Sequence, residues 1–426
     1  MNAQAPGRGG QLGAGTLPVT ALGGFFARLY AGRIDRILSR IDLGLQHGSL
    51  LLHLPGNTSR LLGGRGDGPA AEITIHSWRA IVRFAIGGSI GFYQSYEARE
   101  WDSPDAPTLF SLIMRNAAYL GDTLRAKGPW RFAAIIFHFI RRNSRKGARH
   151  NIAAHYDLGN DFYAQWLDST MSYSGALWDG IAPNAPLAEA QRNKVDQLAD
   201  RLALVPGCRV LEIGSGWGYL ARRLAKQYSA NVTAISLSRQ QIEWTNGQQA
   251  SDPVSDTQFL YQDYRDVSGQ FDAVVSSEMV EAVGRAYWPS YLDCVARVLA
   301  PGGRAAIQYI AIRDELFEAY ARSADFIQTY IFPGGMLLRQ SEFRQLAEER
   351  GFEWHDQSDF GADYARTLKC WREAFDNAVE AGRLPSAFDE RFVRLWRFYL
   401  MYCEGGFAGA GITVSQVTLI KQNLNT

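Results

Sequence analysis

The stretch that most constrains the fold is VLEIGSGWGYLARRL, residues 210–224. An apolar run containing one acidic residue is followed by three alternate glycines, Gly214, Gly216 and Gly218, and then by an amphipathic segment. Glycines let the backbone turn sharply after a strand and approach a ligand closely. The stretch therefore predicts a strand, a ligand-binding loop and a helix, which is the opening unit of a doubly wound α/β sheet.

The spacing of these glycines separates two classes of cofactor. A dinucleotide loop has the form G-x-G-x-x-G and is followed by an acidic residue at the end of the second strand. Here the form is E-x-G-x-G-x-G, and the second predicted strand, NVTAISL, runs into Ser238 and Gln241 instead. We therefore favour S-adenosylmethionine (SAM), and a dinucleotide remains the alternative.

Strand and helix patterns alternate through the C-terminal part of the chain. Short buried strands are predicted at CRVLEIG, NVTAISL, FDAVVSS and GRAAIQYI, and helices at 187–203, GYLARRLAKQY and RQQIEWTNGQQ. Strands separated by helices imply a parallel sheet with helices on both faces. We expect a Rossmann-like domain with helical insertions over residues 151–426.

A length of 426 residues allows two domains. Residues 1–18 are Gly-rich and predict a disordered leader. Residues 19–45 have the spacing of an amphipathic helix, and GSLLLHL, AEITIHS and AIVRFAIGG predict strands, followed by a helix at 109–120. We expect a smaller α+β domain over residues 19–125.

A basic and apolar linker is predicted between the two domains, at residues 126–150. The apolar run at 132–140 is too short to cross a bilayer and is followed by RRNSRKGARH. One interpretation is a solvated linker. The other is contact with an anionic membrane surface, to which each Lys or Arg contributes about 1 kcal/mol.

Composition excludes several other classes of function. The net charge of +1 gives no strong global field, and we expect no nucleic-acid partner. The four cysteines are widely spaced without a CxxC pair, which argues against a disulfide framework or a zinc site. We expect a cytoplasmic protein without a bound metal, either soluble or peripheral to a membrane.

A longer series of motifs resembles one enzyme family. The motifs are HYDLGNDFY, SYSGALW, VLEIGSGWG, YQDYRD, SSEMVEAVG, YIFPGG, FGADYARTL and FYLMYCEGGF, in this order between residues 155 and 407. Together they resemble the cyclopropane-fatty-acyl-phospholipid synthases and the related mycolic acid methyltransferases. In the bacterial synthases of this family a small lipid-binding domain precedes the catalytic domain, and the N-terminal 120 residues resemble it less distinctively. Members are often dimers and act at the inner face of the membrane.

The resemblance implies methyl transfer from SAM to a cis double bond of a phospholipid acyl chain. A carbocation results, which aromatic faces stabilise without bonding to it; the candidates are Tyr173, Tyr309, Tyr330 and Tyr364. Proton loss from the transferred methyl closes a cyclopropane, and the same methyl transfer with a different proton loss gives a methyl-branched or methylene product. A methyltransferase of the same fold acting on a soluble small molecule, and a non-catalytic binder, remain alternatives.

The resemblance also assigns the binding residues for SAM. A Tyr-Ser pair covers the methionine end, and the glycine loop and the ends of the next strands hold the rest. The corresponding residues here are Tyr173, Ser174, Gly214, Gly216, Ser236, Leu237, Gln241, Gln262, Asp263 and Tyr264. His155 and Asp157 are expected to position the entry segment, and Cys403 is expected to be a buried apolar residue.

In the family, the proton acceptor is a bicarbonate ion held by a Cys, a Glu, a His, a Tyr and backbone groups. Glu281, Tyr364 and the backbone of Ile310 match, but Gly175 stands at the Cys position and Gln308 at the His position. Ala282 replaces a second His, and Glu278 stands where glycine is more usual. Either a bicarbonate site persists despite these changes, or a remodelled site uses Glu278 or water as the base.

Overall fold

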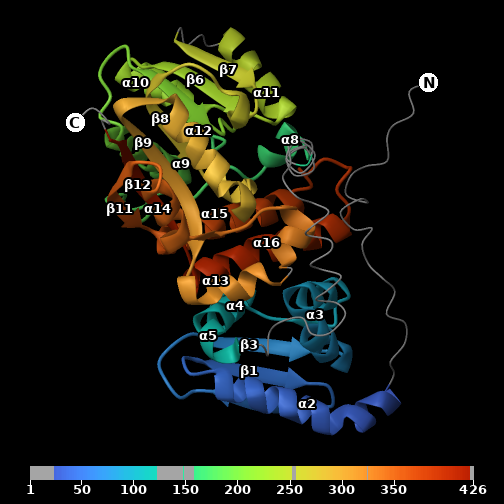
Figure 1. The fold of residues 1–426 in the computed structure, drawn as a ribbon. Helices are drawn as coiled ribbons and strands as arrows, with labels where there is room; N and C mark the ends of the chain where they lie inside the picture. The colour runs from blue at the N-terminus through green and yellow to red at the C-terminus, as the bar shows by residue number, and fades with distance from the viewer. Residues whose placement is uncertain (1–23, 122–146, 148–157, 252–255, 324, 423–426) are drawn as a thin grey trace. The chain divides into compact units, whose positions relative to one another are not determined.

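The computed structural model describes residues 24–121, 147, 158–251, 256–323 and 325–422 (Figure 1). Its contacts divide the chain into two compact units. The first comprises Met1–Ile140, Glu318–Ile331 and Trp371–Gly411, and the second comprises Arg141–Phe317, Phe332–Cys370 and Ile412–Thr426. This division differs from the single boundary expected from the sequence, because two later segments group with the N-terminal residues. The predicted leader and nearly all of the predicted linker lie outside the described residues.

The first unit contains a four-stranded sheet in the order β2-β1-β3-β4. Strands β1 and β2 are antiparallel, β1 and β3 are parallel, and β4 is antiparallel to β3. The strands are β1 (Ser49–Leu54), β2 (Thr58–Gly63), β3 (Ala70–Ile75) and β4 (Trp101–Asp102). Its helices include α2 (Gly24–Gly44), α3 (Trp78–Glu97), α4 (Ala106–Arg115), α5 (Ala117–Leu120) and α16 (Glu390–Ala408), with a π-helix, η5 (Ile327–Ile331).

The strand predicted at AIVRFAIGG is wrong, because these residues belong to helix α3. The side chain of Ser77 accepts a hydrogen bond from the N–H of Arg79 at the start of the helix, which satisfies a free donor there. The glycines interpreted as a strand end form a kink inside the helix, where Gly88 has φ of 57°. The strands predicted at GSLLLHL and AEITIHS and the helix at 109–120 are confirmed, although the latter is divided into α4 and α5.

The second unit contains an eight-stranded sheet in the order β11-β12-β9-β8-β5-β6-β7, with β10 beside β9. The strands are β5 (Arg209–Ile213), β6 (Asn231–Ser236), β7 (Thr257–Tyr261), β8 (Phe271–Ser277), β9 (Leu299–Ile312), β10 (Leu338–Arg339), β11 (Phe352–Asp359) and β12 (Ile412–Lys421). Strands β9 to β7 along this order are parallel, and β12 is antiparallel to both its neighbours.

The helices of this unit follow the predicted alternation. They are α8 (Asn160–Tyr163), α9 (Leu187–Arg201), α10 (Tyr219–Tyr228), α11 (Arg239–Ser251), α12 (Trp288–Val298) and α14 (Gln340–Glu348), with short 3-10 turns η2 (Tyr264–Asp266), η3 (Val280–Ala282) and η4 (Arg285–Tyr287). Two further helices, α13 (Asp314–Ala321) and α15 (Gly361–Glu380), continue from this unit into the first. Among the described residues, no helix is both long and apolar enough to cross a membrane.

One apolar core joins the helices to the parallel strands. Leu198 of α9 and Leu224 of α10 are fully buried in it, together with Val210 of β5 and Val275 of β8. The chain continues from β5 to β6 and β7 on one side, and then returns to β8 and β9 on the other. Such a switch in strand order leaves a crevice at the carboxyl ends of the strands, where ligands bind. The predicted α/β fold class is confirmed.

Candidate active site

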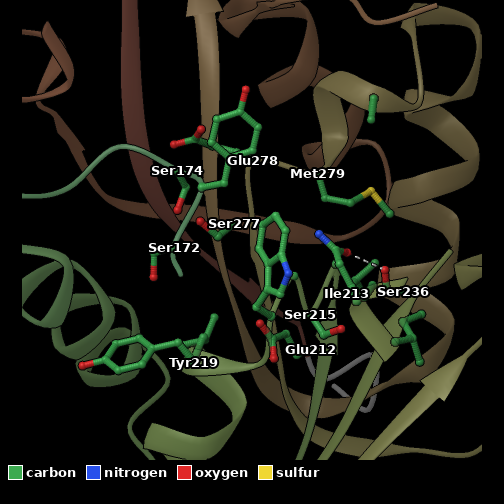
Figure 2. Close-up of a pocket in the computed structure, with 18 of the residues that line it drawn as sticks. Ser172, Ser174, Glu212, Ile213, Ser215, Tyr219, Ser236, Ser277, Glu278 and Met279 are labelled. Atoms are coloured by element: carbon green, nitrogen blue, oxygen red, sulfur yellow. Dashed lines mark hydrogen bonds between the residues drawn. The ribbon is translucent and has the colours of Figure 1, made fainter. Parts of the chain in front are cut away.

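A pocket lies in this crevice, beyond the carboxyl ends of β5, β6 and β8 (Figure 2). Its wall combines the segment 171–174, the glycine loop after β5 and residues 277–279 after β8. The empty volume is about 1180 Å³, including the part open to solvent. A concave pocket at this edge of an α/β sheet is the expected place for a cofactor.

The glycine loop offers both space and polar atoms to a ligand. Gly214 and Gly216 have φ of 92° and 51°, and a Cβ at Gly216 would meet nothing within 4 Å. Glu212 Oε2, Ser215 Oγ and Ser277 Oγ are buried without a hydrogen-bond partner in the described part of the chain. Buried polar atoms are rarely left unpaired, so these three fit a ligand that carries an ammonium group and hydroxyls, as SAM does.

The predicted SAM residues line this pocket, with one exception. Those in the wall are Tyr173, Ser174, Gly214, Gly216, Ser236, Leu237, Gln241, Gln262 and Tyr264. Asp263 is buried outside it and accepts hydrogen bonds from the backbone and guanidinium of Arg265. These hydrogen bonds cap the turn η2, whose Tyr264 lines the pocket.

Helix α9 holds the segment that carries Tyr173 and Ser174. Lys194 Nζ donates to Ser174 Oγ at 2.7 Å, and Gln191 Nε2 donates to the Ser174 carbonyl at 2.8 Å. Lys194 is only 3% exposed, and burial lowers its pKa to about 8, against the opposing charges of Glu278, Asp168 and Glu212. The sequence did not identify Lys194, because a lysine in an amphipathic helix is normally assigned to the solvent face.

The carboxylate of Glu278 is bound by donors from three separate segments. The N–H of Gly175 and the Nε2 of Gln308 donate to Oε1 at 2.8 and 2.7 Å. The hydroxyl of Tyr364 donates to Oε2 at 2.7 Å. We call these three groups the Glu278 donor set. Hydrogen bonds to an ionised carboxylate are about twice as strong as neutral ones, so the donor set favours the charged form.

The backbone of Glu278 is in the left-handed region, with φ of 51°. This conformation costs a residue with a side chain about 1–2 kcal/mol, and glycine avoids that cost. The conformation explains why the resemblance leads us to expect glycine at this position. A glutamate in a strained backbone, held by three donors at the edge of the cofactor pocket, indicates a functional side chain.

Gly175 is required by the ring of Tyr364. A Cβ on Gly175 would lie 2.8 and 2.9 Å from two ring atoms, which is closer than Cβ atoms approach other groups. Gly175 is not among the residues with positive φ, so a turn does not explain it. The cysteine of the family pattern does not fit here while the Tyr364 ring occupies this place.

Glu281 lies in a different environment from Glu278. Its Oε1 accepts a hydrogen bond from the N–H of Ile310, and its Oε2 is buried without a partner in the described residues. Burial first, and then the charge of Glu278, raises the pKa of Glu281 to about 8. Burial also raises the pKa of Glu278, but the donor set and Lys194 oppose that rise. Burial therefore favours the neutral form of Glu281, whereas the donor set stabilises the ionised form of Glu278.

The residues do not fit bicarbonate in the position that the resemblance implied. Gly175, Gln308 and Tyr364, which would hold the ion, all donate to Glu278. The backbone N–H of Ile310 donates to Glu281. The donors expected for an external anion are thus already bound to carboxylates of the chain.

The structure separates the aromatic candidates. Tyr173 lines the pocket, and Tyr364 covers Gly175 and binds Glu278. Tyr309 is fully buried against Phe343 and Trp354 and does not line the cofactor pocket.

The remaining residues singled out in the sequence do not line the cofactor pocket or lie outside the described residues. Tyr330 belongs to the first unit, where it packs against Tyr93. Burial raises the pKa of the Cys403 thiol, which disfavours a nucleophilic thiolate. His155 and Asp157 lie outside the described residues.

Comparison with known proteins identifies the family. The profile of the mycolic acid cyclopropane synthetase family matches residues 143–417, which is more than half of the chain. The chain belongs to this family. Its fold, its glycine loop and its pocket are those of a SAM-dependent methyltransferase, and SAM is its cofactor.

Individual relatives in the family cover most of the chain. The tuberculostearic acid methyltransferase UfaA1 of Mycobacterium tuberculosis is 38% identical over 379 residues, covering 84% of this chain and 85% of the relative. The cyclopropane-fatty-acyl-phospholipid synthase of Escherichia coli is 34% identical over 362 residues, covering 84% and 89%. The structure of the mycolic acid cyclopropane synthase CmaA1 with SAH and CTAB has a TM-score of 0.60 and 28% identity, covering 64% and 98%. The chain is therefore a lipid-modifying member of the methyltransferases.

Proposed function

We propose that this enzyme transfers a methyl group from SAM to the cis double bond of an unsaturated acyl chain in a membrane phospholipid. In this proposal Glu278 accepts the proton that is released, and the product is an open-chain methylene or methyl-branched acyl group. The observation that carries the proposal is the buried Glu278 carboxylate, bound by its donor set at the wall of the cofactor pocket.

The chemistry requires a base in a dry, enclosed site. SAM supplies an electrophilic methyl group when it is bound. The π electrons of the double bond form the new C–C bond while the C–S bond breaks, and the adjacent acyl carbon becomes cationic. One C–H bond must then release its proton. Loss from a neighbouring carbon forms a new double bond beside the methyl branch, and loss from the transferred methyl closes the ring. If a hydride first moves from the methyl-bearing carbon to the cationic carbon, loss from the transferred methyl instead gives a methylene group. Glu278 is suited to accept this proton because its donor set stabilises the ionised form and fixes its position.

Two features support an open-chain product. The Cys and His positions of the ring-forming family pattern are Gly175 and Gln308 here, and a carboxylate of the chain occupies their donors. The relative with 38% identity is named as a tuberculostearic acid methyltransferase. A cyclopropane product is the second candidate, because the matching family and the relative with 34% identity are named for cyclopropane synthesis.

Isotope and reduction analysis of the product separates these candidates. The protein is incubated with vesicles of a monounsaturated phospholipid and methyl-trideuterated SAM, and the acyl chains are examined by mass spectrometry before and after mild hydrogenation. An open-chain product still contains a double bond and gains two hydrogens, whereas a cyclopropane resists this treatment. Retention of all three deuteriums places proton loss on a neighbouring carbon, whereas a product that gains two hydrogens and contains two deuteriums has a methylene group. A product that takes up no hydrogen and contains two deuteriums overturns the open-chain assignment but leaves methyl transfer intact.

Glu278→Gln tests the base directly. The amide keeps the size of the side chain but cannot accept the proton, and general bases typically contribute 10²–10⁴-fold to rate. We expect at least a 100-fold loss of turnover with unchanged SAM affinity. Glu281→Gln is the matched control, because glutamine still accepts the Ile310 N–H and imitates the protonated acid. Turnover of Glu278→Gln close to wild type would exclude Glu278 as the proton acceptor.

We also infer that the enzyme works at the inner membrane surface and that the N-terminal unit binds lipid. The support is a hollow in that unit lined only by apolar side chains, among them Leu38, Leu52, Ile73 and Leu112. Co-sedimentation with anionic vesicles at low salt tests this proposal. Failure to bind vesicles, together with turnover on a soluble substrate, would favour the small-molecule alternative. Light scattering at several protein concentrations tests the homodimer expected from the resemblance.

A further inference from the structure

A chain of side-chain amides leads from Glu278 to the end of helix α9. Gln308 lies on β9 and Gln416 lies directly opposite it on β12, so the two side chains are cross-strand neighbours. Gln416 Nε2 donates to Gln308 Oε1 at 3.0 Å, and Arg201 Nε donates to Gln416 Oε1 at 3.1 Å. Both glutamines are almost completely buried, with exposures of 0% and 1%.

The direction of these hydrogen bonds follows from Arg201. A guanidinium has five donors, no acceptor, and no neutral form in proteins, so it can only face the oxygen of Gln416. An amide with its oxygen fixed on one side presents its N–H groups on the other. Gln416 therefore donates to Gln308, and Gln308 must in turn present Nε2 to Glu278.

Two backbone carbonyls act in the same sense. Gln416 Nε2 also donates to the carbonyl of Lys194 at 3.3 Å, and Gln308 Nε2 donates to the carbonyl of Gly175 at 3.1 Å. A reversed Gln308 would place its oxygen against both that carbonyl and the carboxylate. It would also accept a hydrogen bond from a protonated Glu278 and so stabilise the neutral acid.

We propose that Gln416, oriented by Arg201, is a positioning residue for the reaction because it fixes Gln308 as a permanent donor to Glu278. The inference rests on the proposed function, in which Glu278 accepts the proton. Neither residue touches the cofactor pocket, and neither is assigned by the family motifs in the sequence. We call the hydrogen-bonded series Arg201, Gln416 and Gln308 the relay. It orients the donor to Glu278 between turnovers and so favours the carboxylate form of the base, without contacting substrate.

Gln416→Glu is the decisive variant. A glutamate still accepts from Arg201, so the fold retains that contact, but it has no N–H for Gln308 and should cause Gln308 to reverse. Because the pKa of Glu278 would rise, the acidic limb of the pH profile of kcat should move to higher pH by about one unit. At pH values on that limb, turnover should be roughly tenfold lower than in the wild type. The groups around Glu278 that also influence this limb are Glu281, Lys194 and Tyr364, and all remain unchanged.

Arg201 supplies a second test that does not alter the buried amides. Arg201→Met removes the donor that orients Gln416, and should move the limb in the same direction by less, since the Lys194 carbonyl still holds the amide. Arg201→Lys keeps a cation without acceptors, and should restore the wild-type profile. Ser358→Ala removes another hydrogen-bond partner of Arg201. Ser358 lies opposite Gln416 on β11, but the variant leaves the hydrogen bond from Arg201 Nε to Gln416 in place, so the profile should be unchanged.

The outcomes distinguish the relay from the proposed function. SAM affinity by calorimetry and the melting temperature are measured for every variant, so that a purely structural defect appears as a change in those readouts. If Gln416→Glu melts like the wild type and its profile is unshifted, or if Arg201→Met and Arg201→Lys behave alike, the relay is refuted. If Glu278→Gln retains turnover, the proposed function fails instead. If Glu278→Gln is inactive but the pH profiles of the Gln416 and Arg201 variants are unshifted, the relay is refuted and the proposed function stands.

Discussion

Glu278→Gly removes the carboxylate and leaves its donor set in place. The N–H of Gly175, the amide of Gln308 and the hydroxyl of Tyr364 would then surround a space of carboxylate size. We expect turnover to fall by 10²–10⁴-fold, the usual contribution of a general base. Added formate or bicarbonate should restore part of it, because a small anion can bind the same three donors and accept the proton.

The stability of this variant follows from the backbone of residue 278. With φ of 51°, glycine relieves about 1–2 kcal/mol of strain that any side chain incurs. Glu278→Ala removes the same carboxylate but keeps the strain. The glycine variant should therefore be more stable than the alanine variant by about 1–2 kcal/mol, although both lose the hydrogen bonds of the carboxylate.

Two assays check these expectations. Urea unfolding at neutral pH gives the free-energy difference between the glycine and alanine variants. Turnover on unsaturated phospholipid vesicles is titrated with formate and, separately, with chloride at equal ionic strength. Saturable rescue by formate alone supports the donor set as an anion site. A folded glycine variant that no small carboxylate rescues would refute that site, and equal stability of the two variants would refute the argument from backbone strain.

Three further predictions test neighbouring parts of the site. Gly175→Ala should lower turnover about 10- to 100-fold, because the new Cβ displaces the Tyr364 ring and breaks its bond to the carboxylate, and Tyr364→Phe should reproduce this loss without the steric change. Gly216→Ala should weaken SAM binding in calorimetry at least tenfold. Gly180→Ala is the control, because Gly180 also has positive φ and open space around its Cβ position but lies outside the pocket. It should have the same backbone cost and leave SAM affinity unchanged. Between about pH 4.5 and 8, Glu281 is protonated in the folded state and ionised in the unfolded state, so the free energy of unfolding should fall as pH rises through that range, by up to about 1.4 kcal/mol per pH unit. In urea titrations, the free energy of unfolding of Glu281→Gln should depend less steeply on pH. An unchanged slope would mean that Glu281 is ionised.

The α/β fold could be predicted because its signals are local. A buried strand, a glycine loop and an amphipathic helix follow each other within VLEIGSGWGYLARRL, and the strand–helix alternation after it has few alternatives. The strand prediction at AIVRFAIGG was wrong because helix α3 is kinked and has two glycines near its centre. In the linear sequence, paired glycines after an apolar run are typical of the end of a strand. The grouping of Glu318–Ile331 and Trp371–Gly411 with the N-terminal unit depends on contacts between distant segments and has no local signal.

The candidate site shows the same limit. Glycine spacing and family motifs led to the residues that line the pocket, since most of them follow the end of a strand and Tyr173 and Ser174 belong to a short motif of their own. Lys194 and Gln416 were missed because their burial depends on packing between elements far apart in the sequence. In the sequence, Gly175, Glu278 and Gln308 are three separate departures from the family pattern. In the structure, Gly175 and Gln308 both donate to the carboxylate of Glu278.

These departures compensate one another physically. A side chain at residue 278 requires a strained backbone, and its carboxylate uses the donors that would otherwise bind an external anion. Removing the cysteine side chain at residue 175 makes room for the Tyr364 ring, whose hydroxyl binds the second oxygen of that carboxylate. A base attached to the chain does not have to be bound from solution, so its effective concentration at the reacting carbon is fixed by the fold. On our proposal, the strain at residue 278 is the energetic cost of a proton acceptor that is always present, and the enzyme should turn over at the same rate in buffers with and without bicarbonate.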